Sequence, residues 1–564
     1  MDSSGMKTKI KKPAIKVGHD TQQQDDGQKK VDAQELLTDE ELGLGKASKS
    51  KRSKQSGQDE QQDREQTEQD HAAERPIPES IEDVKAALEE LTGLHKSFDL
   101  VFREMEFGSK KTAFFYANGF AKDAVLTDII VRLSLLKPDE LLADALSSLL
   151  DKYVAHIQVD TEDRLDKAID MVFRGATVLF IDGETSALAI DAKQFPVRSI
   201  DEPALERVVR GARDGFVETL LTNVTLIRRR IRDPHLRLEL VSVGVRTKTD
   251  ICIGYIEDIA DPQLVESLRD KIGKVNIDGI PLGDKQLEEA IIGKGWNPYP
   301  SVRYSERPDV VSSHMLEGHV IVFADTSPSV MILPTTFFHL VQHVEEYRQA
   351  PLVGSYLRWV RFIGIFASLF LLPLWFLLVA NPELKPAGLE FLGPQKEGKL
   401  PVVIQFLMVE VGVDLMRLAA VHTPAPLSVA MGLVAAILIG DIAVKTGLFI
   451  NEVIMYMAIA AIGMFATPSY ELGLANRLVR LVLIVLVAVF KTPGLVIGTT
   501  LWLIWLATNR SYNTPYMWPF LPFNAKAMLS ILVRKPILSN KMRPSITKAQ
   551  DRRRQPEKGT EQSS

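Results

Sequence analysis

The sequence is poor in cysteine, and aromatic residues are missing from one end of it. Cys252 is the single cysteine in 564 residues, which excludes an intrachain disulfide scaffold and a CxxC metal or redox site. Residues 1–80 contain no Phe, Trp or Tyr, so this segment cannot bury enough apolar surface to offset the entropy lost on ordering. The formal net charge of −5 is small for this length and gives no reason to expect nucleic acid as a partner. We expect a disordered polar tail over residues 1–78.

The sequence also lacks an export signal near its start and the motifs of common enzyme classes. Residues 1–22 carry no apolar stretch that a secretion machinery would recognise, so everything before residue 360 is predicted to stay in the cytoplasm. No Walker loop, GxSxG or HExxH pattern occurs; the nearest match, Gly43-Leu-Gly45-Lys46, lacks the earlier glycine and the following Ser or Thr. We predict a protein that is not an enzyme and has no cofactor.

Residues 79–350 show the mixed periodicity of an α/β domain. Segments with apolar residues at helical spacing open near a Pro or Asp, and short runs rich in β-branched and aromatic residues lie between them. This pattern predicts a cytoplasmic α/β domain. The predicted helices are 81–94, 138–153, 203–230, 262–272 and 284–292, and the predicted strands are 113–116, 236–243 and 251–256.

Within this domain the sequence repeats itself. Segments 175–190 and 318–333 align without a gap, and each has two apolar β-branched runs separated by turn residues that begin at Asp182 and Asp325. Such a pattern is typical of a β-hairpin. Two similar hairpins predict two related α/β subdomains within residues 79–350.

The region 351–510 is predicted to be a transmembrane domain. Residues 362–380 contain no charge, and 19 residues form a helix of about 28 Å, which matches the hydrocarbon core of a bilayer. Further apolar spans are predicted at 427–444, 451–467 and 478–507. The last is interrupted by Lys491 and Pro493, so it is either one kinked, tilted span or a re-entrant pair of helices.

Segment 401–420 differs from the other apolar segments because it carries three charged residues on one helical face. Glu410, Asp414 and Arg417 follow at i, i+4 and i+7, so this face avoids lipid and the segment is predicted to be interfacial or re-entrant. If the helix approaches an axial path, the two carboxylates outnumber the one arginine and should leave a net negative belt. The predicted ion-pathway residues are Glu410, Asp414, Arg417, Asp441 and Glu452.

Basic residues on both sides of the apolar region predict its orientation. Arg358 and Arg361 precede the first span, and the segment 511–564 that follows the last span is predicted to be a basic C-terminal tail. Positive residues favour the cytoplasmic side, so both termini are predicted to be cytoplasmic and the number of crossings to be even, with four favoured. Membrane lipid is therefore an expected partner.

Two polar clusters allow a binding or a structural interpretation. His339, His343 and Glu346 could form the edge of a metal site, but the predicted helix 337–348 needs polar residues on its outer face, so no metal site is predicted. The arginine run 228–232 could bind phosphate, yet cations at a helix end favour the helix dipole, and the structural interpretation is preferred.

Five sequence motifs occur in order along the chain and resemble those of the GerA-type spore germination A subunits. They lie at 202–206, 209–216, 223–231, 306–309 and 437–447, and the resemblance covers about residues 95–545. Segments 512–520 and 542–545 are similar to the stage V sporulation protein AF branch, whereas 422–428 lacks the Pro-Lys pair usual in receptor A subunits. The residues that match the family motifs include Glu202, Arg210, Arg213, Arg228, Arg229, Arg230, Glu306, Arg307, Pro308 and Asp309.

The resemblance implies a multi-pass protein of the spore inner membrane that acts with other germination proteins there. It implies a homo-oligomeric ring, with a pentamer as the expected form, and an ion path along the ring axis that opens early in germination. We therefore predict a cation channel subunit. The alternative is a non-conducting scaffold that docks germinant receptors and other channel proteins through its α/β domain.

Overall fold

The computed structural model describes most of the chain from residue 75 to residue 554. All but the last few residues of the predicted tail 1–78 lie outside the described residues. Within 75–554 the segments outside the description are 138–144, 155–157, 195–205, 207, 294, 386–387, 389–391, 397, 423–431, 435–436, 513, 537–538 and 540.

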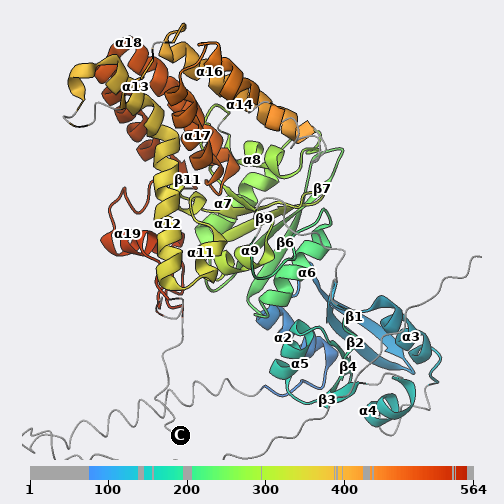
Figure 1. The fold of residues 1–564 in the computed structure, drawn as a ribbon. Coiled ribbons are helices and arrows are strands. Elements are labelled where there is room, and N and C mark those ends of the chain that lie inside the picture. Colours follow the sequence, from blue (N-terminus) through green and yellow to red (C-terminus); the bar gives the residue numbers. More distant parts are fainter. Residues whose placement is uncertain are drawn as a thin grey trace, which may run out of the picture. The chain divides into compact units, whose positions relative to one another are not determined.

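Two five-stranded antiparallel sheets share one strand order (Figure 1). The first follows β1-β2-β4-β5-β3 and the second β6-β7-β9-β10-β8. The helices also occur at equivalent positions in the order of elements of the two subdomains. The first subdomain contains α2 (Ile81–Thr92), β1 (Leu100–Phe107), β2 (Lys110–Ala117), α3 (Asp123–Leu133), α4 (Ala145–Ser148), the π-helical turn η2 (Leu149–Tyr153), β3 (Val159–Glu162), α5 (Leu165–Phe173), β4 (Thr177–Ile181) and β5 (Ala187–Ile190). The second contains α6 (Leu220–Arg230), β6 (Leu236–Val243), β7 (Thr249–Ile256), α7 (Pro262–Gly273), α8 (Asp284–Ile292), β8 (Arg303–Ser305), α9 (Pro308–Met315), β9 (Val320–Ala324) and β10 (Val330–Leu333).

The two repeated segments form the two predicted hairpins. Strands β4 and β5 pair antiparallel, as do β9 and β10. The turn aspartates have equivalent roles, because Asp182 accepts a hydrogen bond from the Ile81 amide at the start of α2 and Asp325 accepts one from the Leu220 amide at the start of α6. In each subdomain the hairpin turn therefore satisfies a free amide at the first helix.

Helices cover both faces of each sheet. In the first subdomain α2 and α5 share a core with one face, and α3, α4 and η2 share a core with the other. In the second subdomain α6 and α9 share a core with one face of the sheet, and α7 and α8 share a core with the other. The central strands are buried on both faces, which is why their sequences are uninterrupted apolar runs. Cys252 lies fully buried in the second core, and burial raises the pKa of its thiol.

Most predicted elements in the α/β domain exist, but the prediction of a helix over 203–230 is wrong in its described first half. Helix α6 begins only at Leu220, and residues 208–219 have an irregular backbone. Predicted helix 138–153 is described only from Ala145. The sequence reading missed the edge strands β1, β3 and β8, since a strand that lies at an edge or is very short carries little apolar periodicity.

A layer of apolar helices follows the second subdomain. Helices α12, η3 and α13 form one continuous helix, Pro351–Ala380, which begins earlier than the predicted span 362–380. Among the described residues two helices, Pro351–Ala380 and Tyr470–Thr508, are long and apolar enough to cross a membrane. The elements are α10 (Phe337–Leu340), α11 (Val344–Arg348), α12 (Pro351–Phe366), η3 (Ala367–Leu371), α13 (Leu372–Ala380), η4 (Pro382–Leu384), α14 (Val402–His422), η6 (Ile437–Ile442), α16 (Ala443–Lys445), α17 (Asn451–Phe465) and α18 (Tyr470–Thr508), followed by β11 (Arg510–Ser511), β12 (Thr514–Pro515), α19 (Ala525–Leu532) and η8 (Ser545–Thr547).

Segment 401–420 forms α14, a helix of 21 residues or about 31 Å. Near its start, Gln405 accepts a hydrogen bond from the Ile450 amide just before α17. Further along, α14 packs against both α17 and α18. Most of the predicted span 427–444 lies outside the described residues, and the predicted span 451–467 corresponds to α17.

Helix α18 folds back on itself at Lys491, whose φ is 55° and ψ −129°. A Cβ added to Gly498 would lie 2.7 Å from Leu483 Cδ2, and one on Gly494 would lie 2.1 Å from the Leu486 carbonyl oxygen. Residues 483 and 498 of a straight helix would be roughly 22 Å apart. The structure therefore has a pair of helices that pack on each other, with legs 470–490 and 492–508, in place of one kinked span.

The open end of this hairpin packs on the second subdomain. The Tyr299 hydroxyl accepts a hydrogen bond from Trp502 Nε1 at 2.6 Å and donates one to Asn476 Oδ1 at 3.2 Å. Asn476 and Trp502 belong to different legs, so one buried tyrosine holds both. The C-terminal segment returns to the same subdomain, where Ala549 is buried in the core and Gln550 contacts the Ile259 carbonyl. Residues 541–554 are thus packed rather than a free tail.

A cysteine pair tests the hairpin. Leu483→Cys with Gly498→Cys should form an intramolecular cross-link on oxidation or with a short bismaleimide, because the two side-chain positions are adjacent. Cys252 is buried and should not react. The measurement is the mobility of the chain on a denaturing gel, with each single-cysteine variant as control. A double variant that cross-links no better than the single ones would require a straight α18.

Candidate functional site

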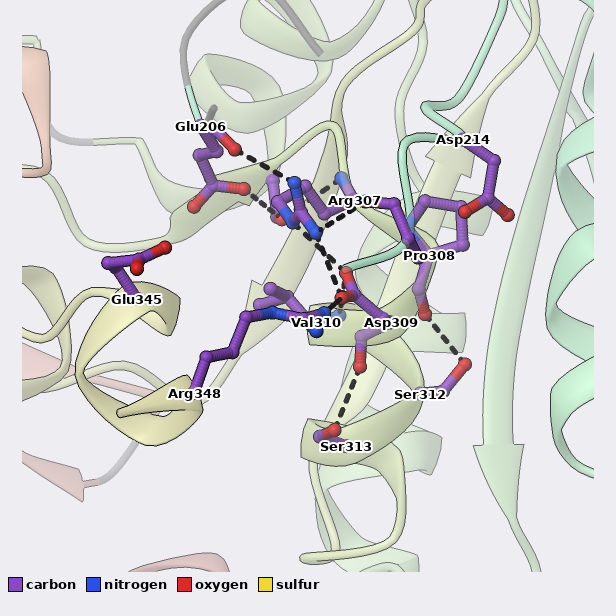
Figure 2. A network of polar contacts seen from close by, with 12 residues as sticks. Glu206, Asp214, Arg307, Pro308, Asp309, Val310, Ser312, Ser313, Glu345 and Arg348 are labelled. Carbon is purple, nitrogen blue, oxygen red and sulfur yellow. Dashed lines mark hydrogen bonds and ion pairs between the residues drawn. The ribbon is translucent and has the colours of Figure 1, made fainter. Parts of the chain in front are cut away.

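Arg307 is the centre of a buried polar network that we call the clasp, formed by Glu206, Arg307, Asp309 and Arg348. The Arg307 side chain is 1% exposed, and its Nε and Nη2 donate to Asp309 Oδ1 and Oδ2 at 3.0 and 2.9 Å. Its Nη1 and Nη2 also donate to the carbonyls of Glu206 and Ala212, both at 3.0 Å. Figure 2 shows the Arg307 guanidinium between Glu206 and Asp309. One cation thereby holds the segment before α6 against the start of α9.

The local sequence explains this position of Arg307. Pro308 occupies the first turn of α9, where its missing N–H costs nothing, and Asp309 places a carboxylate at the positive end of the helix. The Glu306 carbonyl accepts a hydrogen bond from the Phe216 amide at 2.8 Å. Because Arg307 and Glu306 use the polar backbone groups of 206–216, that segment does not form the predicted helix.

The clasp extends to α11. Arg348 Nη2 contacts Asp309 Oδ2 at 2.5 Å, and Glu345 accepts a hydrogen bond from the Val209 amide at 3.3 Å. Gly211 has a φ of 136°, and a Cβ there would lie 2.1 Å from the Arg348 guanidinium. Burial alone would raise the pKa of Asp309, but the hydrogen bonds and charges of the two arginines outweigh it and lower that pKa.

The residue after Glu345 connects α11 to the first long apolar helix. Glu346 is fully buried, and its Oε2 lies 2.7 Å from Arg358 Nε, while Arg361 forms a second ion pair with it. Arg358 also donates to the carbonyls of Ser530 and Ile531 in α19. Figure 1 shows α12 passing beside α11 and α19. Arg358 and Arg361, used above to predict orientation, are therefore structural ion-pair partners.

A second polar network, the α14–α18 cluster, lies between apolar helices. It contains Glu410, Asp414, Arg417, Arg477 and Arg480. Glu410 is 2% exposed, with Oε2 at 2.8 Å from Arg477 Nε and Oε1 at 2.5 Å from Arg480 Nη2. Asp414 pairs with Arg417 at 2.9 Å and also with Arg477. Two carboxylates meet three guanidinium groups, so the expected net negative belt on α14 is wrong: the cluster carries a net positive charge.

The other predicted ion-pathway residues are not part of this cluster. Asp441 pairs with Lys445 at 2.7 Å and is more than half exposed. Glu452, at the start of α17, is partly exposed and accepts a hydrogen bond from the Gln395 amide at 3.0 Å.

The family-motif arginines have mainly structural contacts. Arg228 is buried and bidentate to Asp99 of the first subdomain at 2.8 and 3.0 Å, so it joins the two subdomains. Arg230 pairs with Asp214 at 2.5 Å. These contacts favour the structural interpretation of the arginine run. Arg210 and Arg213 are exposed. Glu202 lies outside the described residues.

The structure does not bring His339, His343 and Glu346 together as the edge of a metal site, which agrees with the interpretation preferred from sequence. Helix 337–348 is interrupted between α10 and α11, and Glu346 faces Arg358 instead of the histidines. In the described part of the chain no group of His, Cys, Asp and Glu is placed to hold a metal ion.

Sequence reasoning missed a cluster of three histidines in the second subdomain, of which His319 is fully buried. The rings of His314, His319 and His339 have centroids 5.0, 5.3 and 6.1 Å apart. Burial lowers the pKa of each, and that of His319 falls to about 4. No local sequence signal marks them, since His339 comes from a different element from the other two.

A family model for the Bacillus/Clostridium GerA spore germination protein matches residues 87–546. The chain belongs to the GerA family. It is 48% identical over 464 residues to stage V sporulation protein AF of Bacillus subtilis (strain 168), covering 82% of this chain and 94% of that protein. It is 30% identical to spore germination protein KA of the same organism over 86% of this chain and 90% of that protein.

A solved structure is also similar in sequence. The N-terminal domain of the A subunit of the Bacillus megaterium spore germinant receptor GerK3 is 26% identical, with a TM-score of 0.36. The match covers 46% of this chain and 97% of that domain.

Neutralising Asp309 tests the clasp. Asp309→Asn keeps the shape but leaves Arg307 buried without its anionic partner, so the unfolding free energy should fall by about 3 kcal/mol. Asp214→Asn removes a partly exposed pair outside the clasp and should cost less than about 1 kcal/mol. Denaturant unfolding of the full chain in detergent micelles measures both. If both variants lowered the unfolding free energy equally and by little, Asp309 would not be the residue that neutralises the buried Arg307.

The buried histidine predicts a pH-dependent stability. The folded pKa of His319, about 4, lies below its unfolded value near 6.5, so the unfolded chain binds the proton first as pH falls. Its contribution should lower stability by about 2 kcal/mol between pH 7 and pH 5. His319→Asn should remove that part of the slope. An unchanged difference in unfolding free energy between the two pH values would contradict a neutral, buried His319.

Proposed function

We propose that this chain is a multi-pass subunit of the spore inner membrane that assembles into a ring and conducts cations early in germination. Membership of the GerA family supports a role in germination. The observation that carries the channel proposal is the α14–α18 cluster, since five ionisable groups within apolar helices are costly and usually mark a functional site.

The packing supports an even number of crossings. Helix α14 has a spanning length, and the two legs of α18 leave from and return to the same side, where Tyr299 holds both. The helix Pro351–Ala380 begins next to α11, and residues 541–554 pack on the second subdomain. Both described ends of the apolar layer therefore join the α/β domain, which fits cytoplasmic termini. In this proposal the four crossings are Pro351–Ala380, α14 and the two legs of α18, so α14 crosses the layer instead of lying at the interface as the sequence predicted.

The acidic residues Glu410, Asp414 and Glu452 differ in their burial and ion pairs, and we propose a different role for each kind. Glu410 is fully enclosed between two arginines and serves to hold α14 on α18. The Asp414 side chain keeps 36% of its surface exposed in the single chain. Glu452, at the opposite end of the layer, is partly exposed as well. We assign the accessible negative charge along the ion path to Asp414 and Glu452, repeated around the ring.

The alternative function is a non-conducting scaffold. The clasp and the Glu346 ion pairs favour it, because they attach the large α/β domain firmly to the first apolar helix.

Charge-only variants in liposomes separate the two functions. The double variant Asp414→Asn, Glu452→Gln should lower cation flux severalfold with an unchanged oligomeric mass, because Glu410 still neutralises Arg477. Glu410→Gln is the matched control: it strands buried guanidinium groups and should destabilise the chain or its assembly. Cation flux and mass in detergent are the readouts.

The results expected for a scaffold and for a channel differ. An assembled wild-type chain that binds other germination proteins but seals the liposome would support the scaffold. Normal flux through an assembled double variant would remove Asp414 and Glu452 from the path and leave Asp441 as the remaining acidic candidate.

A further inference from the structure

A cavity of about 640 Å³ lies at the clasp, outside the apolar layer. Its walls come from α9, α10, α11, the segment before α6 and the C-terminal segment. A volume of several hundred cubic ångströms is usual for a small-molecule site. Parts of the chain that are far apart in sequence meet here, including Arg210, Asp309, Arg348 and Lys535.

The walls carry more positive than negative charge. Five cationic side chains face two carboxylates, Asp309 and Glu317. Both carboxylates are already paired, Asp309 with Arg307 and Arg348, and Glu317 with Arg554 at 3.2 Å. The five cations are Arg210, Arg303, Arg348, Lys535 and Arg554.

Two of these cations have no ion-pair partner within the described ranges, namely Arg210 and Lys535. They approach from different segments, one from the irregular stretch before α6 and the other after α19. Arg303, by contrast, donates to the His339 carbonyl at 2.9 Å and lies 3.5 Å from Glu206. The surplus charge is therefore carried by side chains that are available to bind.

One histidine of the wall, His343, can donate a hydrogen bond to an anion. His343 Nδ1 accepts a hydrogen bond from the Glu345 amide at 3.2 Å, so its Nε2 carries the proton and is a donor. His314 Nδ1 lies 2.8 Å from the Val310 carbonyl and is the protonated nitrogen there, so its Nε2 is an acceptor and His314 is not a donor to the anion. The positive charge of Arg303 acts on His314 and His339 and opposes a further cation. Donors and cations dominate this surface.

We propose that this cavity binds a small phosphate-type oxyanion, which Arg210 and Lys535 contact from opposite segments with the imidazole of His343 as a neutral donor. Phosphate oxygens accept hydrogen bonds from guanidinium, ammonium and imidazole groups at once. The anion can be a soluble phosphate or the headgroup of an anionic lipid, since α11 leads directly into the first apolar helix. Binding of the anion does not depend on whether the chain conducts ions.

Occupancy would have a structural consequence. An anion between Arg210 and Lys535 would draw the C-terminal segment and the stretch before α6 onto α11, next to Arg348 of the clasp. Arg534, the neighbour of Lys535, already donates to the Tyr347 and Gln349 carbonyls at 2.6 and 2.5 Å. The bound state would tighten the attachment between the α/β domain and the helix Pro351–Ala380.

Calorimetric titration of the full chain in dodecyl maltoside with inorganic pyrophosphate, at constant ionic strength, tests the soluble form. Lys535→Gln and Arg210→Gln should each weaken binding roughly tenfold, because each removes one charged contact to the anion. Lys541→Gln, in the same C-terminal segment but outside the cavity lining, should bind like wild type.

A second arm tests the lipid form, using micelles doped with phosphatidic acid or with phosphatidylcholine as reference. Retention of phosphatidic acid that is lost in Lys535→Gln and Arg210→Gln supports the site with a lipid headgroup as ligand. Pyrophosphate binding with the same dependence supports it with a soluble ligand. Absence of binding in both arms, or equal weakening by Lys541→Gln, overturns the proposal.

Discussion

Buried arginines determine how the parts of this chain are joined. Among the described residues, the five largest fully buried side chains are those of Arg228, Arg237, Arg307, Arg358 and Arg480. A guanidinium cannot be buried unless nearly all its donors find partners, and it cannot lose its proton to avoid the cost. Each of these residues therefore fixes several backbone segments at once, and each lies where two separate parts of the molecule meet.

The contacts of these arginines follow the chain from one part to the next. Arg228 joins the subdomains through Asp99, and Arg307 attaches the stretch before α6 to α9. Arg358 joins α11, α12 and α19, and Arg480 ties α18 to α14 and to the Ser368 carbonyl in η3. Neighbouring junctions share elements, such as α11 between the clasp and α12. Buried polar contacts thereby join the α/β domain to the apolar helices.

The sequence alone predicted what depends on local pattern. The repeated hairpins, α8 and the charge-free part of the first apolar helix were recognisable because periodicity and turn residues are short-range signals. The net charge of the α14–α18 cluster could not be predicted in this way, since Arg477 and Arg480 lie more than sixty residues after Glu410. The helix predicted over 206–216 is wrong for the same reason. Two carbonyls of this segment accept hydrogen bonds from Arg307, which lies about a hundred residues later, and local periodicity contains no information about such a contact.

The α14–α18 cluster also limits how a conducting path could open. Separating α14 from the first leg of α18 would expose Glu410 and Arg480 to a low-dielectric layer, at a cost of several kcal/mol per ion. These two helices should therefore move together. Asp414 can exchange partners between Arg417 and Arg477 without leaving the cluster, and its side chain is already partly exposed. A gate that uses this cluster would thus change the exposure of Asp414 while the Glu410 pairs remain closed.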